Sequence, residues 1–253
     1  MSSDSPSGVL LVTGAGRGIG AGIARMGASR GYAVCVNYGR SQIEAETLAH
    51  DIEAAGGRAL AVQADVGDAD QVAHLFATMD AELGPLTALI NNAGILETRQ
   101  PLEDMEPEFL GSIFAVNTFS CFYCAGQAIK RMSTAHGGKG GAIVNISSKA
   151  AVLGGLPGWS HYAASNGAID SFTISLAREV GPQGIRVNAI RPGVIPTDIQ
   201  KAATDVDFPA AARQTTSLGR MGTVEEVAEV ALWLLSEQAS YVHGIVLDVS
   251  GGR

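Results

Sequence analysis

The alternation of short apolar runs with longer amphipathic segments restricts the fold of this chain more than any other feature. In the longer segments apolar residues recur every three or four positions, which is typical of helices. Strands that alternate with helices predict a parallel sheet covered on both faces. The strand-like runs are Gly8–Gly14, Tyr32–Tyr38, Arg58–Asp65, Thr87–Gly94, Gly141–Ser148, Ile185–Gly193 and Gly244–Gly251. We therefore expect an α/β fold with a doubly wound, seven-stranded parallel sheet.

The chain is expected to form a single domain over residues 1–253, because no linker, repeat or low-complexity tract interrupts the alternation. Helical segments such as the one after Ser41 and the one after Asp68 begin with capping residues and end in glycine. The segment 196–218 lacks a regular strand pattern, and we expect it to form a lid over the functional site.

Composition excludes several classes of function. The net charge of −8 argues against nucleic acid or an anionic membrane as a partner. The N-terminal residues lack the basic and apolar regions of a secretion signal, and no apolar run reaches transmembrane length. Cys35, Cys121 and Cys124 provide no second pair to complete a zinc site. We expect a cytoplasmic protein with reduced cysteines and no bound metal.

The stretch TGAGRGIG, from Thr13 to Gly20, follows the first predicted strand and opens a helix. Glycines at such a turn let the backbone approach a pyrophosphate, and the helix N-terminus supplies N–H groups and a positive dipole end. Between a strand and a helix, this pattern predicts a dinucleotide-binding turn.

The spacing of Gly14, Gly18 and Gly20 resembles the T-G-x-x-x-G-x-G turn of the short-chain dehydrogenase/reductase family, and the resemblance covers almost the whole chain. It implies a Rossmann-type sheet in the order 3-2-1-4-5-6-7, a nicotinamide cofactor, a carbonyl or alcohol substrate and a homotetramer. The cofactor-binding residues that it implies are Gly14, Arg17, Gly18, Ile19, Gly20, Asn37, Arg40, Asp65, Val66, Asn92, Ala93, Gly94, Tyr162, Asn166, Pro192, Gly193, Ile195 and Thr197.

The resemblance also implies catalytic roles. Tyr162 matches the family's acid/base tyrosine, and Ser148 matches the serine that orients the substrate oxygen. Asn117 matches the asparagine that holds a proton-relay water. Trp159 is expected at the mouth of the substrate pocket, and His161 near that mouth rather than in a proton relay.

The end of the second predicted strand indicates which nicotinamide cofactor is bound. An acidic residue there binds the ribose 2′-hydroxyl and repels a 2′-phosphate, but this chain has Asn37 at the place we assign to that acid. Arg17 and Arg40 lie close by in the sequence and can meet a 2′-phosphate. These residues favour NADP(H) over NAD(H).

The chain departs from the family at Asn166, where the resemblance leads us to expect a lysine four residues after the tyrosine. Asparagine can bind a ribose hydroxyl but brings no charge. If the lysine lowers the tyrosine pKa by about three units, its loss removes roughly 4 kcal/mol of support for phenolate. Felt fully in the transition state, this is on the order of a thousandfold in rate.

Two other lysines, Lys149 and Lys201, are alternatives for the missing charge. We expect a carbonyl reductase frame that is weakened by Asn166, whether the change is natural or engineered. The other hypotheses are imine reduction or another repurposed chemistry on this frame, and a nucleotide-binding protein without catalysis.

Overall fold

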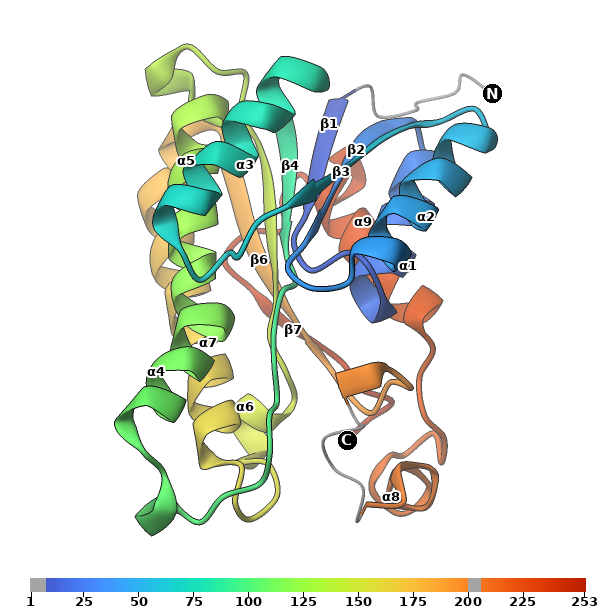
Figure 1. The fold of residues 1–253 in the computed structure, drawn as a ribbon, viewed down its shortest axis with the longest axis vertical. Helices are drawn as coiled ribbons and strands as arrows, with labels where there is room; N and C mark the ends of the chain where they lie inside the picture. The colour runs from blue at the N-terminus through green and yellow to red at the C-terminus, as the bar shows by residue number, and fades with distance from the viewer. Residues whose placement is uncertain (1–7, 200–205) are drawn as a thin grey trace.

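The computed structural model describes residues 8–199 and 206–253. Its centre is a parallel sheet of seven strands in the order β3-β2-β1-β4-β5-β6-β7 (Figure 1). The strands are β1 (Gly8–Val12), β2 (Tyr32–Tyr38), β3 (Arg58–Gln63), β4 (Leu86–Asn91), β5 (Gly141–Ile146), β6 (Ile185–Pro192) and β7 (Val246–Val249). The predicted fold class and strand order are confirmed.

Helices cover both faces of this sheet. Helices α1 (Gly18–Ser29), α2 (Gln42–Ala54) and α9 (Val224–Leu235) lie on one face, and α3 (Ala69–Glu82), α5 (Ser120–Met132) and α7 (Ser160–Val180) on the other (Figure 1). Three shorter helices lie toward the lower end of the view, namely α4 (Pro107–Phe114), α6 (Ala150–Leu153) and α8 (Phe208–Thr215). The segment η2 (Ala115–Phe119) is a π-helix between α4 and α5.

The strands form because their side chains are buried on both faces, as parallel strands require. Along β1, Leu10 and Val12 belong to the core beneath α1, α2 and α9, whereas Val9 and Leu11 belong to the core beneath α3, α5 and α7. Leu10, Leu11 and Val12 have no exposed surface. The continuous apolar run of β1 therefore contributes side chains to the hydrophobic cores on both faces of the sheet.

The strand bounds differ from the predicted runs mainly at the carboxyl ends. β2 has its predicted bounds, but the other six strands end earlier, because the last residues of each run turn away into the loops. Strand β1 pairs with β2 on one side and β4 on the other, so the chain reverses its winding direction there. Ligands of doubly wound sheets bind in the crevice at this switch point.

Two predicted helix caps have different outcomes. Asp68 caps α3, since its side chain accepts hydrogen bonds from the backbone N–H groups of Asp70 and Gln71. Ser41 is the N-cap residue of α2, but its hydroxyl makes no capping hydrogen bond. The hydroxyl of Ser41 therefore stays available on the side of α2 that faces the glycine-rich turn.

Helices α4 and α5 and the π-helix between them form one helix, Pro107–Met132, that by length and composition alone is apolar enough to cross a membrane. One face of α5 packs on the sheet through Cys124, Ala125 and Ala128, which belong to the core. Phe119 and Phe122 are exposed on the same continuous helix. This helix therefore packs on the sheet with one apolar face and has a second, exposed apolar surface that includes Phe119 and Phe122.

Candidate active site

The glycine-rich turn joins the carboxyl end of β1 to α1. Gly14 and Gly18 have φ values of +61° and +57°, which glycine adopts without the steric cost of a Cβ. A Cβ at Gly20 would lie 2.5 Å from Nδ2 of Asn92, so α1 starts in direct contact with the segment after β4. The first N–H groups of α1, including that of Ile19, have no partners within the helix and suit a pyrophosphate.

Four hydrogen bonds join the segment after β4 to this turn. The hydroxyl of Thr13 accepts hydrogen bonds from the backbone N–H groups of Asn92 (2.9 Å) and Ala93 (3.0 Å). The side-chain amide of Asn92 donates to the carbonyls of Thr13 (2.9 Å) and Gly14 (3.1 Å). The predicted residues Asn92 and Ala93 therefore lie against the glycine-rich turn, and Gly94 follows them in the chain.

Asn37 lies near the carboxyl end of β2, the place that we assign to the acid. Its side chain is buried beneath the turn, with 1% of its surface exposed. Its Oδ1 accepts from the N–H of Gly14 (3.2 Å), and its Nδ2 donates to the carbonyls of Val62 (3.3 Å) and Ala64 (3.1 Å). These bonds use the side chain of Asn37 to hold the turn from below, which argues against a direct contact between this side chain and the cofactor.

Arg17 lies in the glycine turn and Ser41 contacts it, while Arg40 precedes Ser41 in the chain. Arg17 is exposed and pairs with Asp198, with Arg17 Nη1 3.5 Å from Asp198 Oδ2. Arg40 follows β2 and is exposed. A Cβ at Gly16 would lie 2.4 Å from Oγ of Ser41, so this hydroxyl, which sequence reasoning took for a cap, rests against the turn.

The predicted adenine contact, Asp65 and Val66, lies just after β3. Asp65 is exposed, and its carboxylate accepts a hydrogen bond from the N–H of Gly67 (2.9 Å). Val66 is 4% exposed and belongs to the core. The loop is well shaped to present Asp65 outward, while the side chain of Val66 is used for packing.

Ser148, Tyr162 and Asn166 meet where β5 and α7 approach each other. The side chains of Ser148 and Asn166 lie close enough to the phenol of Tyr162 to lower its pKa. Asn166 is 4% exposed, and its Nδ2 also donates to the carbonyl of Tyr162 one turn earlier (2.9 Å). The structure therefore brings together the serine, the tyrosine and the residue at the predicted lysine position.

The surroundings of Tyr162 keep its phenol neutral. Burial raises the pKa of Tyr162 above its ordinary value of 10.0, and the hydrogen bonds from Ser148 and Asn166 lower the pKa by less. A neutral phenol is a proton donor. As it stands, the site is better prepared to protonate a substrate than to deprotonate one.

Asn117 lies in the π-helix and binds the segment after β4. Its Oδ1 accepts from the N–H of Ile95 (2.8 Å), and its Nδ2 donates to the carbonyl of Ile95 (2.9 Å) and to Oγ of Ser165 (3.1 Å). Ser165 Oγ in turn donates to the carbonyl of Tyr162 (3.0 Å). The side chain of Asn117 thus anchors the helix turn of Tyr162, and the water that we predict beside Asn117 stays a prediction.

A network of ion pairs lies at the carboxyl ends of β6 and β7. Arg191 Nε is 2.8 Å from Asp170 Oδ2 and its Nη1 is 3.5 Å from Asp248 Oδ1, while Lys149 Nζ pairs with Asp248 Oδ2. The side chain of Lys149 is 12% exposed, and its ammonium group is paired with the carboxylate of Asp248. This pairing argues against Lys149 as the substitute for the missing lysine, and Lys201 lies outside the described residues.

The predicted segment after β6 packs onto the glycine turn. A Cβ at Gly193 would lie 2.7 Å from Cα of Ser250, so only glycine fits beside the strand end of β7. The N–H of Gly193, next to Pro192, donates to the carbonyl of Val249 (2.9 Å). The Thr197 side chain lies against Gly18, 3.3 Å from the place of a Cβ there.

A small apolar cluster adjoins Tyr162. Leu96 and Trp159 are buried in it, and the partly buried side chains packed against them are Tyr162, Ile199, Val206 and Phe208. His161 is buried beside the cluster, where its Nε2 lies 3.1 Å from the carbonyl of Leu96. Trp159 and His161 therefore line the side of Tyr162 that we expect to receive substrate, and His161 anchors a loop there.

Comparisons with known proteins agree with this arrangement. Residues 14–253 match the family model described as Enoyl-(Acyl carrier protein) reductase. The chain is 42% identical over 245 residues to the uncharacterized oxidoreductase YgfF of Escherichia coli (strain K12), covering 97% of this chain and 99% of that protein. It is 39% identical over 255 residues to Versicolorin reductase 1 of Aspergillus parasiticus, covering 96% and 95%. A short chain dehydrogenase from Burkholderia cenocepacia J2315, solved in complex with NADP, superposes with a TM-score of 0.90 at 32% identity, covering 98% and 99%. The chain belongs to the short-chain dehydrogenase/reductase family.

Several residues that support the site of this short-chain dehydrogenase/reductase were missed from sequence. Asn145 accepts a hydrogen bond from Asn91 (2.8 Å) and donates one to Thr173 (2.9 Å), which ties β4 and β5 to α7. Asp170 was missed although it lies eight residues after Tyr162, on the same helix face. Its helical spacing from Tyr162 and Asn166 is the signal that could have found it.

Proposed function

We propose that this oxidoreductase is NADPH-dependent and interconverts a carbonyl compound and an alcohol, with Tyr162 as the acid/base. The observation that carries the proposal is that Ser148 lies close enough to the phenol of Tyr162 to lower its pKa, beyond the carboxyl end of β5, as the glycine-rich turn lies beyond the carboxyl end of β1. A proton donor and an oxygen-orienting hydroxyl are what carbonyl reduction asks of the protein.

The residues around the glycine turn fit a dinucleotide. Close contacts at Gly18 and Gly20 leave no room for side chains between the turn, Thr197 and Asn92. Backbone N–H groups of α1 would hold the pyrophosphate, and Thr197 would lie at the nicotinamide end. NADPH, when bound there, supplies the hydride that reduces the carbonyl carbon.

The preference for NADP(H) rests on charge at the outer side of the turn. No acidic residue occurs between Tyr32 and Ser41, while Arg17 and Arg40 are both exposed there. A 2′-phosphate would attract both guanidinium groups. The NADP-bound dehydrogenase from Burkholderia cenocepacia is similar over nearly the whole chain, which supports the same choice.

In the reduction direction, the Tyr162 hydroxyl gives its proton to the substrate oxygen as the carbonyl becomes an alcohol, and Ser148 donates a hydrogen bond that orients this oxygen. In the oxidation direction, Tyr162 must first lose its proton. We propose that Asn166 occupies the family's lysine position and supports phenolate with a neutral amide donor only. Oxidation should therefore be weakened more than reduction.

The neutral Asn166 beside Tyr162 is also the observation that favours a second candidate, reduction of an imine. A protonated imine already carries the proton that a ketone oxygen takes up during reduction, so it depends less on a charged partner of the tyrosine. A protein that binds NADPH but reduces neither class would be a nucleotide-binding protein without catalysis.

The experiment is NADPH oxidation measured with purified protein over a panel of ketones, aldehydes and cyclic imines. Reduction of one carbonyl class supports the proposal, and reduction of imines alone supports the second candidate. Tight NADPH binding with no turnover on either class contradicts both.

Cofactor choice is tested by fluorescence titration with NADPH and NADH. We expect tighter binding of NADPH, and Arg40→Asp should move the preference toward NADH. Lys139→Asp makes the same charge change on an exposed loop just before β5. This loop lies at the amino ends of the strands, whereas the glycine turn lies at their carboxyl ends, so the variant should leave the preference unchanged. Equal affinities in the unchanged protein would contradict the assignment.

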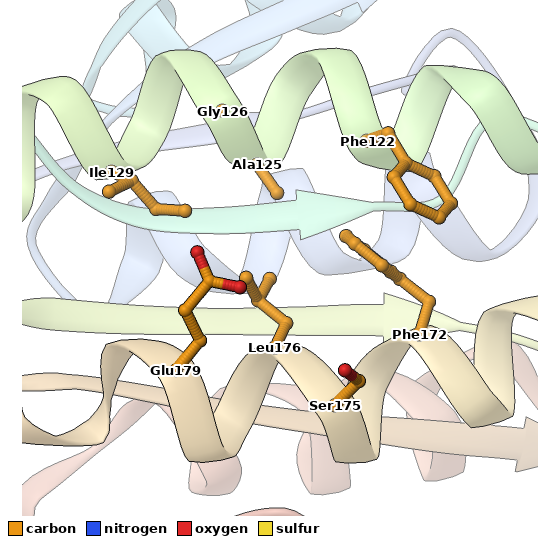
Figure 2. Close-up of a pocket in the computed structure, with 8 residues that line it drawn as sticks. All are labelled: Phe122, Ala125, Gly126, Ile129, Phe172, Ser175, Leu176 and Glu179. Carbon is orange, nitrogen blue, oxygen red and sulfur yellow. The ribbon is translucent and has the colours of Figure 1, made fainter.

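We infer that the protein is a homotetramer and that α5 and α7 supply one contact between copies. A groove between these helices is lined mainly by apolar side chains, including Phe122, Ile129, Phe172 and Leu176, together with the polar side chains of Ser175 and Glu179 (Figure 2). Phe122 is 48% exposed, and its ring centroid is 4.0 Å from that of Phe172. The face continues the apolar helix Pro107–Met132, and a second copy would cover both helices.

We also propose a cytoplasmic location. Cys35, Cys121 and Cys124 are free and buried, and burial raises the pKa values of Cys35 and Cys121 to about 12. Such thiols are unreactive. A reducing compartment is consistent with three cysteines that form no disulfide in the structure.

A further inference from the structure

One wall of the apolar cluster beside Tyr162 is built from two fastened segments. The loop that carries Leu96 and Gln100 runs alongside the start of α7. His161 Nε2 is 3.1 Å from the carbonyl of Leu96, and the N–H of Gln100 donates to the carbonyl of Gly158 (3.0 Å). The guanidinium carbon of Arg99 lies 4.8 Å from the centre of the Trp159 ring. The indole of Trp159 is therefore held in a fixed place.

Three polar atoms of this wall have no hydrogen-bond partner within the described residues. Two are Nε1 of Trp159, a donor, and Oε1 of Gln100, an acceptor, and both are shielded from solvent, as is the third unpaired atom of the wall, Nδ1 of His161. Trp159 as a whole is 4% exposed. Buried polar atoms in folded proteins are normally paired, and each exception calls for an explanation.

The backbone of the same loop is strained. Glu97 has a φ of +56°, and it is the one non-glycine residue with positive φ in the described ranges. Non-glycine residues in this conformation concentrate at functional sites, where the surrounding structure holds them. Strain and unpaired polar atoms thus occur together on the wall that adjoins Tyr162.

We propose that Trp159 Nε1 and Gln100 Oε1 bind a second polar group of the substrate, a hydroxyl that accepts from the indole N–H and donates to the amide oxygen. This inference rests on the proposed function, because it names the substrate class of the same site. Trp159 precedes Tyr162 by three residues, and the two side chains pack in the same apolar cluster. The substrate is a hydroxylated carbonyl compound with an apolar body that packs on Leu96.

The test compares acetophenone with its three ring-hydroxylated isomers. We expect at least one isomer to exceed acetophenone about tenfold in kcat/KM, through KM, because the buried polar pair is left unsatisfied by the plain ketone. Trp159→Phe keeps an aromatic ring and removes the N–H, and Gln100→Met removes the acceptor. Each should abolish most of this preference, measured as the ratio of kcat/KM for the hydroxylated isomer to kcat/KM for acetophenone.

Trp233→Phe is the matched control, since Trp233 is the other tryptophan of the chain and is 40% exposed on α9. Circular dichroism melting identifies any variant that fails to fold, and the two independent variants keep the test decisive. Equal kcat/KM for acetophenone and all isomers in the unchanged protein would overturn the inference. So would folded variants at both positions that keep the preference.

Calorimetric binding of the same four ketones to the NADP⁺ complex separates this inference from the proposed function. If no carbonyl is reduced but a hydroxylated isomer binds more tightly and Trp159→Phe removes the difference, the polar subsite stands and the reductase assignment fails. If carbonyls are reduced and bound without regard to the hydroxyl, the reductase assignment stands and the subsite is wrong.

Discussion

At the scale of single residues, Tyr162 sits in surroundings that raise its pKa above the ordinary value of 10.0, chiefly through burial. Below that pKa the phenol is neutral, so Tyr162 can donate its proton in the proposed reduction. The proposed oxidation requires the phenolate. At pH values below the pKa, the phenolate fraction increases about tenfold for each unit by which the pH rises. The two directions should therefore respond differently to pH.

We predict that kcat/KM for alcohol oxidation rises steadily with pH to beyond about pH 10, whereas kcat/KM for carbonyl reduction is nearly flat between about pH 6 and about pH 9. Both are measured with one ketone–alcohol pair in the unchanged protein. An oxidation profile that levels off near pH 7 would mean that another group lowers the pKa of Tyr162.

Asn166→Lys should raise the oxidation rate by roughly tenfold to a thousandfold, because a charge beside Tyr162 lowers its pKa by up to about three units. The gain should be smaller for reduction. Asn166→Met is the matched control, since it adds a long side chain without charge, and it should give no gain. A lowered or unchanged rate in both directions with Lys would show that asparagine is the functional residue for a different chemistry.

Residues that belong to a recognisable sequence motif could be predicted from the sequence, whereas the contacts of buried polar side chains could not. Gly14, Gly18 and Gly20 were predicted because only glycine suits the turn. The contacts of Asn37 were not predicted, because strand periodicity does not reveal that a side chain at a strand end folds under the neighbouring loop to bind its backbone.

At the scale of elements, the strands and their order were predictable, because buried parallel strands leave continuous apolar runs. The π-helix Ala115–Phe119 was not, since it inserts into an apolar helical pattern without a glycine or proline to mark it. The ion pairs that join β6, β7 and α7 were also missed, because they bring together Asp170, Arg191 and Asp248 from distant parts of the chain.

The pair of Asp170 and Arg191 is well shielded, with side chains 10% and 18% exposed. Asp170→Asn should lower the free energy of unfolding by roughly 2–4 kcal/mol, because it leaves a largely buried guanidinium with a weaker partner. Asp51→Asn breaks the exposed pair with Arg25, whose side chains are 52% and 61% exposed, and should cost less than about 1 kcal/mol. Urea unfolding of both variants measures the difference, and equal losses would refute the structural role of the Asp170 pair.

At the scale of the whole molecule, the apolar groove between α5 and α7 predicts an assembly rather than an isolated chain. Phe122→Asp should place a charge in the contact between copies and reduce the assembly to smaller species. Ile43→Asp is the control, since Ile43 is 78% exposed on α2, away from that groove. Sedimentation velocity reports the masses; an unchanged protein that sediments as a monomer would contradict the proposed tetramer.

The most direct test of the account is a single turnover with enzyme in excess over NADPH, followed by absorbance, for the unchanged protein and Tyr162→Phe. Tyr241→Phe is the control, because Tyr241 is fully exposed. We predict that Tyr162→Phe slows carbonyl reduction at least about a hundredfold while NADPH affinity changes little, since the proton donor is lost and the ring remains. Reduction at an unchanged rate in Tyr162→Phe would show that Tyr162 is not the acid and that the proposed mechanism is wrong.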